Sequence, residues 1–264
     1  MSILTHSPAI VRDGLVFCLD IGAVSSHPGS GTVVRNLVNR NHTGTIGGAT
    51  YTVSDGARSS KGMRYLAFDG TNDTLSLLDV ENWMPTGDYT VEIVFDRQFT
   101  AADSSQYILY YASGSYMFFR GDGNNDNFFC MRKIGANAVS GASSGDWYGN
   151  SSWGGQTGVR LSDGANEIGV NDLRHLTFTM ESHRTTGVGK AYRDGVYMES
   201  ANLYDNNNGA STDDHGGFVA ESGSIVIAHN YSEMSLYVLR FYNRILTAKE
   251  IESNYRATKA RFGK

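Results

Sequence analysis

Three aromatic residues, Trp147, Tyr148 and Trp153, lie close together in a glycine- and serine-rich stretch, beside Asp146 and Asn150. Aromatic faces stack on the C–H surfaces of sugars, and Asp and Asn exchange hydrogen bonds with hydroxyl groups. Aromatic anchors are equally typical of protein interfaces. These five residues are the candidate ligand-binding site. A sugar platform and an assembly contact are its two interpretations, and the assembly contact is favoured.

Asp122, Asn124 and Asp126 have the spacing of the first ligands of a calcium loop. Position six of such a loop would be Asn127 rather than Gly, and position twelve would be Lys133 rather than Glu, so an EF-hand is excluded. The three residues are the candidate metal site, and a structural calcium is the one cofactor left open. Polar turns at 205–208 and 213–214 are alternative sources of oxygen ligands.

Glycoside hydrolysis requires two carboxylates that face each other across the scissile bond. Glu92 and Asp96 share one face of an expected strand, but Glu92 is predicted to point to solvent, opposite Val91 and Ile93. The Gly-Ala-Ser-Ser-Gly run at 141–145 matches a serine-nucleophile motif, yet it lacks the strand and helix that the motif needs. We therefore expect no enzyme, and a hydrolase is the second alternative.

The candidate residues must be positioned by strands, because short alternating apolar runs separated by glycine turns recur along the chain. Asp69-Gly70, Asp122-Gly123 and Asp194-Gly195 supply such turns. The expected strands are 15–19, 65–68, 74–77, 89–95, 107–111, 116–119, 128–132, 173–180, 189–193, 224–228 and 236–242. This pattern predicts an all-β sandwich or jelly roll.

The end of the chain changes period. Tyr237, Leu239 and Phe241 are assigned to one face of the closing strand, and the residues between them to the other face: Leu236, Val238 and Arg240. Thr247 and Glu250 then form a capping box, which predicts a helix. Its apolar stripe is expected at Ala248, Ile251 and Tyr255.

Composition limits the function. The 264 residues include 31 glycines and only 3 prolines, which fits one large β domain. The net charge of −5, without a cluster of Lys and Arg, excludes nucleic acid as a partner. The start of the chain lacks a secretory signal and the apolar run 15–19 is too short to span a membrane, so we expect synthesis in the cytoplasm and no membrane insertion. Cys18, in that run, is expected to be a buried free thiol, and the state of Cys130 is left open.

Several segments, in this order, resemble the laminin-G-like, concanavalin-A-like modules of tailed-phage virion proteins. They are 10–20, 27–32, 36–37, 65–73, 173–178, 190–196 and 239–251. The main departure is Arg174, which stands where that family usually has tryptophan. Residues 97–172 match nothing in the family.

The resemblance implies a two-sheet antiparallel β-sandwich with one short C-terminal helix. We expect an N-terminal arm at 1–12 and a single domain at 13–264, with a long variable insertion at about 97–172. It further implies a non-enzymatic structural protein displayed on a virion, as a capsid decoration or a tail or fibre component. Its expected partners are other virion proteins or copies of itself. The first alternative is a lectin-like adhesin for host or environmental glycans.

Overall fold

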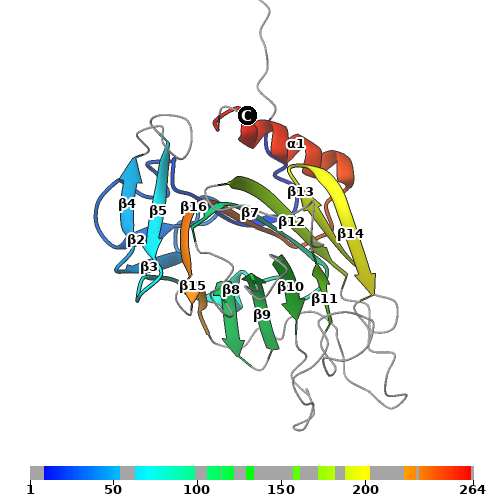
Figure 1. Ribbon diagram of the computed structural model, residues 1–264, viewed down its shortest axis with the longest axis horizontal. Helices are drawn as coiled ribbons and strands as arrows, with labels where there is room; N and C mark the ends of the chain where they lie inside the picture. Colours follow the sequence, from blue (N-terminus) through cyan, green and yellow to red (C-terminus); the bar gives the residue numbers. More distant parts are fainter. Residues whose placement is uncertain are drawn as a thin grey trace, which may run out of the picture.

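Two antiparallel β-sheets pack face to face, and a single long helix lies against the outside of one of them (Figure 1). This computed structural model describes residues 9–53, 63–98, 106–113, 115–121, 129–133, 157–160, 172–181, 188–202, 223–229 and 232–262. The predicted fold class, an all-β sandwich with one C-terminal helix, is confirmed.

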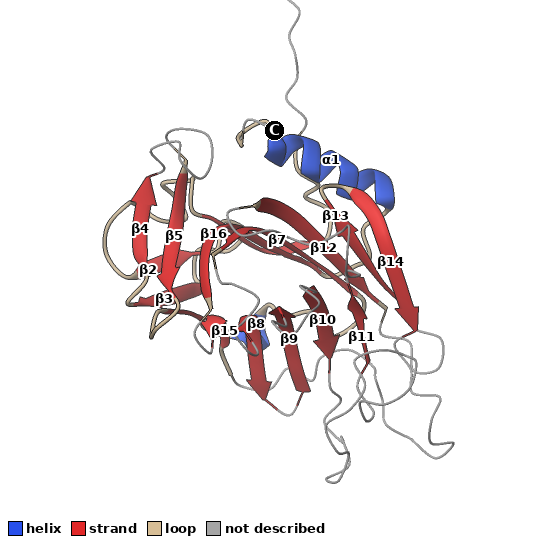
Figure 2. Ribbon diagram, in the orientation of Figure 1, coloured by secondary structure: helices blue, strands red, loops and turns tan. Residues whose placement is uncertain are grey.

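Sheet A carries the helix and sheet B lies beneath it (Figure 2). In spatial order, sheet A contains β14 (Val196–Asn202), β13 (Val188–Arg193), β12 (Leu173–Met180), β7 (Tyr89–Arg97), β16 (Glu233–Tyr242), β5 (Arg64–Asp69) and β4 (Thr50–Val53), and β1 (Leu15–Asp20) also pairs with β16. Sheet B contains β11 (Thr157–Arg160), β10 (Phe129–Lys133), β9 (Ser115–Gly121), β8 (Gln106–Ser113), β15 (Ile225–His229), β6 (Thr74–Leu77), β3 (Thr43–Gly47) and β2 (Val33–Arg35). The helices are the short η1 (Val80–Asn82) and α1 (Ala248–Lys259).

Every strand expected from the sequence is present, with its ends shifted by a few residues at most. The sequence pattern missed β2, β3, β4, β11 and β14. In β3 the reason is clear, because Gly44 takes a core position that would normally signal a strand by a large apolar residue. A Cβ at Gly44 would lie 2.9 Å from Val34 and 3.0 Å from Leu77. Close packing therefore requires glycine there and removes the alternating pattern.

The main core fills the space between the sheets. Sheet A contributes side chains such as Ile93 and Phe178, and sheet B contributes Leu75 and Ile227, all at 1% exposure or less. Cys18 is a buried free thiol, as expected, and burial raises the pKa of that thiol. A buried thiol with a raised pKa is a poor nucleophile, which makes Cys18 a packing residue.

The face assignment for the closing strand was partly wrong. Leu236 lies in the main core with Leu239 and Phe241, whereas Tyr237 belongs to a second cluster on the outer face of sheet A. The reason is a bulge in the pairing of β16 with β7, where Leu236 lies opposite Phe95, Val238 lies opposite Val94, and Tyr237 has no counterpart. One extra residue reverses the alternation on its N-terminal side.

Helix α1 begins at the predicted capping box. The Thr247 hydroxyl accepts from the backbone N–H of Glu250, and the Glu250 carboxylate accepts from the backbone N–H of Thr247. The predicted apolar stripe was only partly correct, because Ile251 is buried, Tyr255 is half-buried and Ala248 is exposed. The buried side chains of the helix are Ile251, Asn254 and Thr258. The helix thus docks on sheet A through a largely polar face.

The turn between β13 and β14 lies directly under α1. Asp194 and Gly195 both have positive φ, at 52° and 79°, as a two-residue hairpin turn requires. A Cβ at Gly195 would lie 3.0 Å from the Tyr255 ring and 3.3 Å from the Glu252 backbone. Gly195 therefore serves both the turn and the close approach of the helix.

A matched pair of glycine substitutions separates these two roles. Gly31 also has positive φ, at 83°, but a Cβ there would meet nothing within 4 Å. We expect Gly31→Ala to lower the free energy of unfolding by about 1–2 kcal/mol through backbone strain alone, and Gly195→Ala to lower it further because Tyr255 must move. Urea unfolding measures both changes. Equal losses would contradict the close approach of α1.

Candidate functional site

The outer face of sheet A places a carboxylate and a guanidinium in direct opposition. In the register of the sheet, Thr177 pairs with Glu92, Glu92 with Arg240 and Arg240 with Cys18, which forms one row across four strands. Glu92 is fully buried and Arg240 is 3% exposed. Both charges are therefore removed from water, and each requires partners within the protein.

Those partners come from β16 and α1. Arg240 Nη1 donates to Glu92 Oε2 at 3.0 Å, and Asn254 Nδ2 donates to Glu92 Oε1 at 2.9 Å. The same Asn254 amide donates to the Tyr242 hydroxyl at 3.0 Å, and the guanidinium of Arg240 lies 3.4 Å from the Thr258 hydroxyl. We call Glu92, Arg240, Tyr242, Asn254 and Thr258 the buried network.

The prediction that Glu92 points to solvent was wrong. The alternation of β7 correctly placed it opposite Val91 and Ile93, on the face away from the main core. However, α1 covers that face, so the residue is buried rather than solvated (Figure 2). Both carboxylate oxygens of Glu92 accept hydrogen bonds, which suits a structural anion better than a general acid or base.

Contacts within the network also set the protonation states of two of its members, Arg240 and Tyr242. Burial disfavours the charge of Arg240, but the Glu92 carboxylate outweighs this and raises the pKa of Arg240 above its usual value. Burial, and then the Glu92 charge, raise the pKa of the Tyr242 hydroxyl. Tyr242 therefore keeps its proton and donates it to the carbonyl oxygen of Val11 at 3.2 Å.

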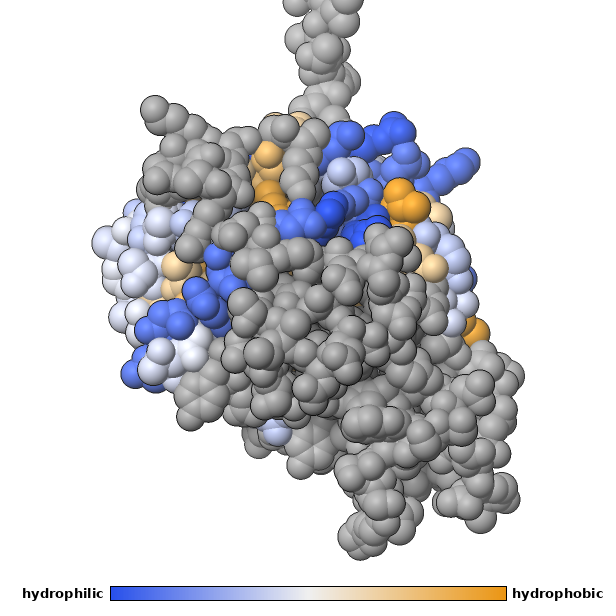
Figure 3. Space-filling model, in the orientation of Figure 1, coloured by the Kyte–Doolittle hydropathy of each residue, from blue (hydrophilic) through white to orange (hydrophobic). Residues whose placement is uncertain are grey.

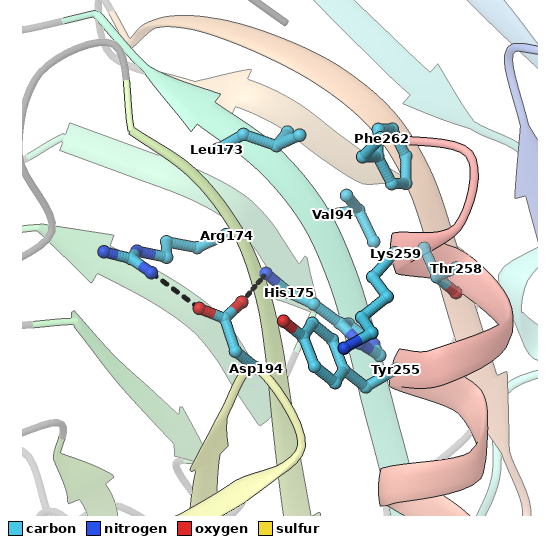
Figure 4. Close-up of a pocket in the computed structure, with 9 residues that line it drawn as sticks. All are labelled: Val94, Leu173, Arg174, His175, Asp194, Tyr255, Thr258, Lys259 and Phe262. Atoms are coloured by element: carbon cyan, nitrogen blue, oxygen red, sulfur yellow. Dashed lines mark hydrogen bonds and ion pairs between the residues drawn. The ribbon is translucent and has the colours of Figure 1, made fainter. Parts of the chain in front are cut away.

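A small pocket adjoins the network at the end of α1 (Figure 4). It offers about 10 Å³, room for about one water molecule and far too little for a sugar ring. Tyr255 and Lys259 reach over it from the helix, and His175 and Asp194 line it from the sheet. The pocket is lined by Val94, Leu173, Arg174, His175, Asp194, Tyr255, Thr258, Lys259 and Phe262.

Arg174, the residue that departs from the family pattern, has a structural role beside this pocket. Its guanidinium contacts Asp172 at 2.5 Å and Asp194 at 2.6 Å, and Asp194 also accepts from the backbone N–H of His175 at 3.1 Å. These contacts attach the β13–β14 turn to β12. Arg174 thus forms a charged clamp between this turn and the strand.

The residues predicted to bind a ligand or a metal all belong to stretches that the structure does not describe. Asp146, Trp147, Tyr148, Asn150 and Trp153 lie outside the described residues, as do Asp122, Asn124 and Asp126 and the serine motif at 141–145. Within the described ranges, no group of three or more His, Cys, Asp or Glu side chains could hold a metal ion. The structure leaves these predictions untested.

The outer face of sheet B carries a row of uncharged residues across neighbouring strands. Val226 lies on it, because its neighbours Ile225 and Ile227 point into the core. Cross-strand pairing places Tyr110 and Ser76 beside Val226, then Thr45 and Val33. These residues are half-buried or exposed and carry no charge. No described helix covers this face (Figure 1).

The buried network escaped sequence reasoning, although a signal was present. Glu92 is predicted to lie on the solvent side of its strand, and Arg240 on the face of the closing strand opposite Leu239. Asn254 lies three residues after Ile251 on the helix. An acid, a base and an amide that all face the region under one helix are complementary partners. Without knowing that α1 covers β7 and β16, however, the sequence pattern cannot distinguish this burial from solvation.

Comparison with known proteins gives structural matches only. No protein-family model and no curated protein matches the chain. The binding domain of Paraclostridial Mosquitocidal Protein 1 aligns with a TM-score of 0.62 and 13% identity, over 92% of this chain and 52% of that one. The binding domain of botulinum neurotoxin DC, solved with rat synaptotagmin II, aligns with a TM-score of 0.62 and 10% identity, over 92% and 51%.

The sialidase of Trypanosoma rangeli aligns with a TM-score of 0.57 and 15% identity, over 95% of this chain and 34% of the enzyme. The chain thus spans about half the length of the toxin structures and about a third of the sialidase. These likenesses show a β-sandwich fold. Among the described helices, none is long and apolar enough to cross a membrane.

Removing one charge of the buried pair tests its structural role. Arg240→Met leaves Glu92 buried without its counter-charge and is expected to cost about 3–5 kcal/mol of unfolding free energy. Arg256→Met is the control, because Arg256 pairs with Glu252 at the surface, and there a change within about 0.5 kcal/mol is expected. Urea unfolding measures both. If the two variants lose the same stability, the pair does not hold the sheet and helix together.

Proposed function

We propose that this chain is a non-enzymatic binding module displayed on the surface of a tailed-phage virion. The observation that carries the proposal is the contrast between the two outer faces of the sandwich. Sheet A is covered by α1 and contains the buried network, whereas the outer face of sheet B carries the uncharged row from Tyr110 to Val33, beside the exposed Arg35, and no described helix covers it. One face is committed to structure, and the other is available to a ligand or partner.

The attachment side of the module is the α1 side. At the start of the described chain, the Val11 backbone N–H donates to Asn254 Oδ1 at 2.7 Å. At its end, Phe262 packs against Tyr237 on the outer face of sheet A. The first and last described residues of the chain therefore both lie on the α1 side of the sandwich. A tether through the N-terminal arm would present sheet B away from the particle.

The geometry of the carboxylates argues against hydrolysis as the activity. Of the two candidate carboxylates, Glu92 is bound by Arg240 and Asn254, and Asp96 is also fully buried on the outer face of sheet A. The neighbouring pocket admits about one water molecule. A substrate cannot reach either group while α1 is docked, which supports a non-enzymatic role.

Glycan binding is the alternative that specific residues favour. Tyr110 offers an aromatic ring on the outer face of sheet B, and Ser76 and Thr45 add hydroxyl groups in the same cross-strand row. Stacking combined with hydroxyl hydrogen bonds is the chemistry of sugar recognition. Two of the similar solved structures are themselves binding domains, which supports a binding role in general.

The described surface shows no broad apolar patch on the face drawn in Figure 3, where hydrophobic residues form small separate spots. Edge-to-edge assembly through β2 is also blocked at Arg35. Its backbone N–H donates to the Ser26 carbonyl at 2.8 Å, and the Ser26 hydroxyl donates to the Arg35 carbonyl at 3.0 Å. Such capping is a common protection of edge strands, so contacts with other copies require another surface.

A glycan array with the full chain distinguishes the two functions. The structural role predicts no binding to any glycan. The lectin alternative predicts binding that weakens in Tyr110→Ala by about 1 kcal/mol, roughly fivefold, and persists in the control Tyr197→Ala, which removes an exposed tyrosine of β14. Hydrolysis of an arrayed polysaccharide that is abolished by Glu92→Gln would contradict the non-enzymatic proposal.

Light scattering after size-exclusion chromatography tests assembly. We expect trimers or concentration-dependent oligomers, as a displayed structural protein requires. Deleting residues 1–8 is expected to yield monomers while sparing Val11, whose bonds to Asn254 and Tyr242 support the fold. A chain that is monomeric at every concentration before the deletion would contradict self-assembly.

A further inference from the structure

The imidazole of His175 lies between α1 and sheet A and makes no hydrogen bond to a described residue. It is 3% exposed, and neither ring nitrogen is bonded to any described residue. Its Nε2 lies 3.7 Å from Glu92 Oε1, which is beyond hydrogen-bond distance. Burying an imidazole without a hydrogen bond destabilises the fold, and such a group in a folded protein calls for an explanation.

The imidazole is buried, but it borders a pocket that has room for about one water molecule. The water-sized pocket is lined by Asp194 from the sheet side and by Tyr255 and Lys259 from α1 (Figure 4). Asp194 keeps 19% of its side chain exposed, and Tyr255 stacks on the imidazole with ring centroids 6.0 Å apart. A small outward movement of α1 would therefore hydrate His175.

The charges around His175 are balanced only while the ring is neutral. Glu92 from β7 faces it and is already neutralised by Arg240 from β16. Asp194 from the β13–β14 turn is likewise bound by Arg174. The helix contributes the ammonium group of Lys259 and the hydroxyl of Tyr255 to the same pocket. A proton on His175 would therefore add an uncompensated positive charge beneath α1.

The helix is the part that this charge would displace. Its buried side chains are Ile251, Asn254 and Thr258, so little apolar surface holds it to the sheet. The main core of the sandwich, by contrast, lies between the sheets and does not include α1. Segments with few buried apolar contacts open at lower free energy than the core.

We propose that His175 makes α1 an acid-released latch: protonation of the imidazole detaches the helix, and with it the segment 9–12, from an otherwise intact sandwich. The segment is loosened with the helix because Asn254 holds the Val11 backbone N–H, which leaves the Tyr242 hydroxyl as the remaining hydrogen bond to the Val11 carbonyl. Detachment exposes the charged outer face of sheet A and frees the chain on the attachment side. The imidazole of His175, the Tyr255 ring that stacks on it and the nearby Asp194 thus control the release of the N-terminal arm.

The direction of the pH dependence follows from His175. Burial, the largest cause, and the Arg240 charge lower its pKa from the ordinary 6.5, against smaller opposing effects of Glu92 and Asp194. The closed form therefore binds a proton less readily than the open form. The contribution to latch stability is fully present above about pH 6.5 and is lost as the pH falls below that value.

Hydrogen exchange of the full chain between pH 7.5 and 5.0, corrected for intrinsic rates, tests the latch. We expect the protection of α1 to fall by up to about tenfold per pH unit below 6.5, as the uptake of one proton on opening requires, while β16 stays protected. The Glu250 cap does not interfere, because hydrogen bonds from Arg244 hold the pKa of Glu250 at about 2, below its ordinary 4.5.

His175→Gln keeps a polar side chain that cannot be charged, and we expect it to abolish the pH dependence of α1 protection. His42→Gln is the matched control, since His42 lies in the β2–β3 connection, and it should retain the dependence. Protection of α1 that does not change with pH, or a dependence that persists in His175→Gln, would overturn the proposal. If His175→Gln does not fold, imidazole ¹⁵N shifts of the native chain decide: protonation of His175 with α1 still protected would also overturn it.

Discussion

The fold depends on one buried ion pair, Glu92 with Arg240, on the outer face of sheet A. Two charges removed from water are costly unless they pair with each other and use most of their remaining hydrogen-bonding sites. Asn254 satisfies the second oxygen of Glu92, and Thr258 lies beside the guanidinium. The central strands β7 and β16 therefore require α1, and α1 is in turn the element that binds the segment at Val11. Register, helix docking and chain entry are linked through a single polar cluster.

This constraint divides the molecule. A face that must stay dry to hold an ion pair cannot also be an open binding surface, which is why we propose the outer face of sheet B for recognition. The same constraint explains why a polar helix face is retained: apolar residues there would leave Glu92 Oε1 without the hydrogen bond from Asn254. The imidazole of His175 is an ionisable group between α1 and sheet A. In our proposal it makes the docking of α1 sensitive to acid.

Local rules predicted much of this fold. Alternation located the long strands, Thr247 and Glu250 located the helix start, and Asp-Gly pairs located the turns at Gly70 and Gly195. The failures have physical causes. The bulge at Tyr237 shifts the register by one residue, and the burial of Glu92 depends on a helix more than a hundred residues away. The prediction of a ligand site at Trp147 and Trp153 rests on residue types alone, because no local rule specifies which residues a long insertion contacts.

The central claim is that one face serves structure and attachment while the opposite face serves recognition. Cryo-electron microscopy of intact particles that carry this chain tests it most directly. The account predicts density for the sandwich with α1 and residues 9–12 directed toward the particle and the outer face of sheet B directed toward solvent. A map in which sheet B is buried against the particle and α1 faces solvent would contradict it.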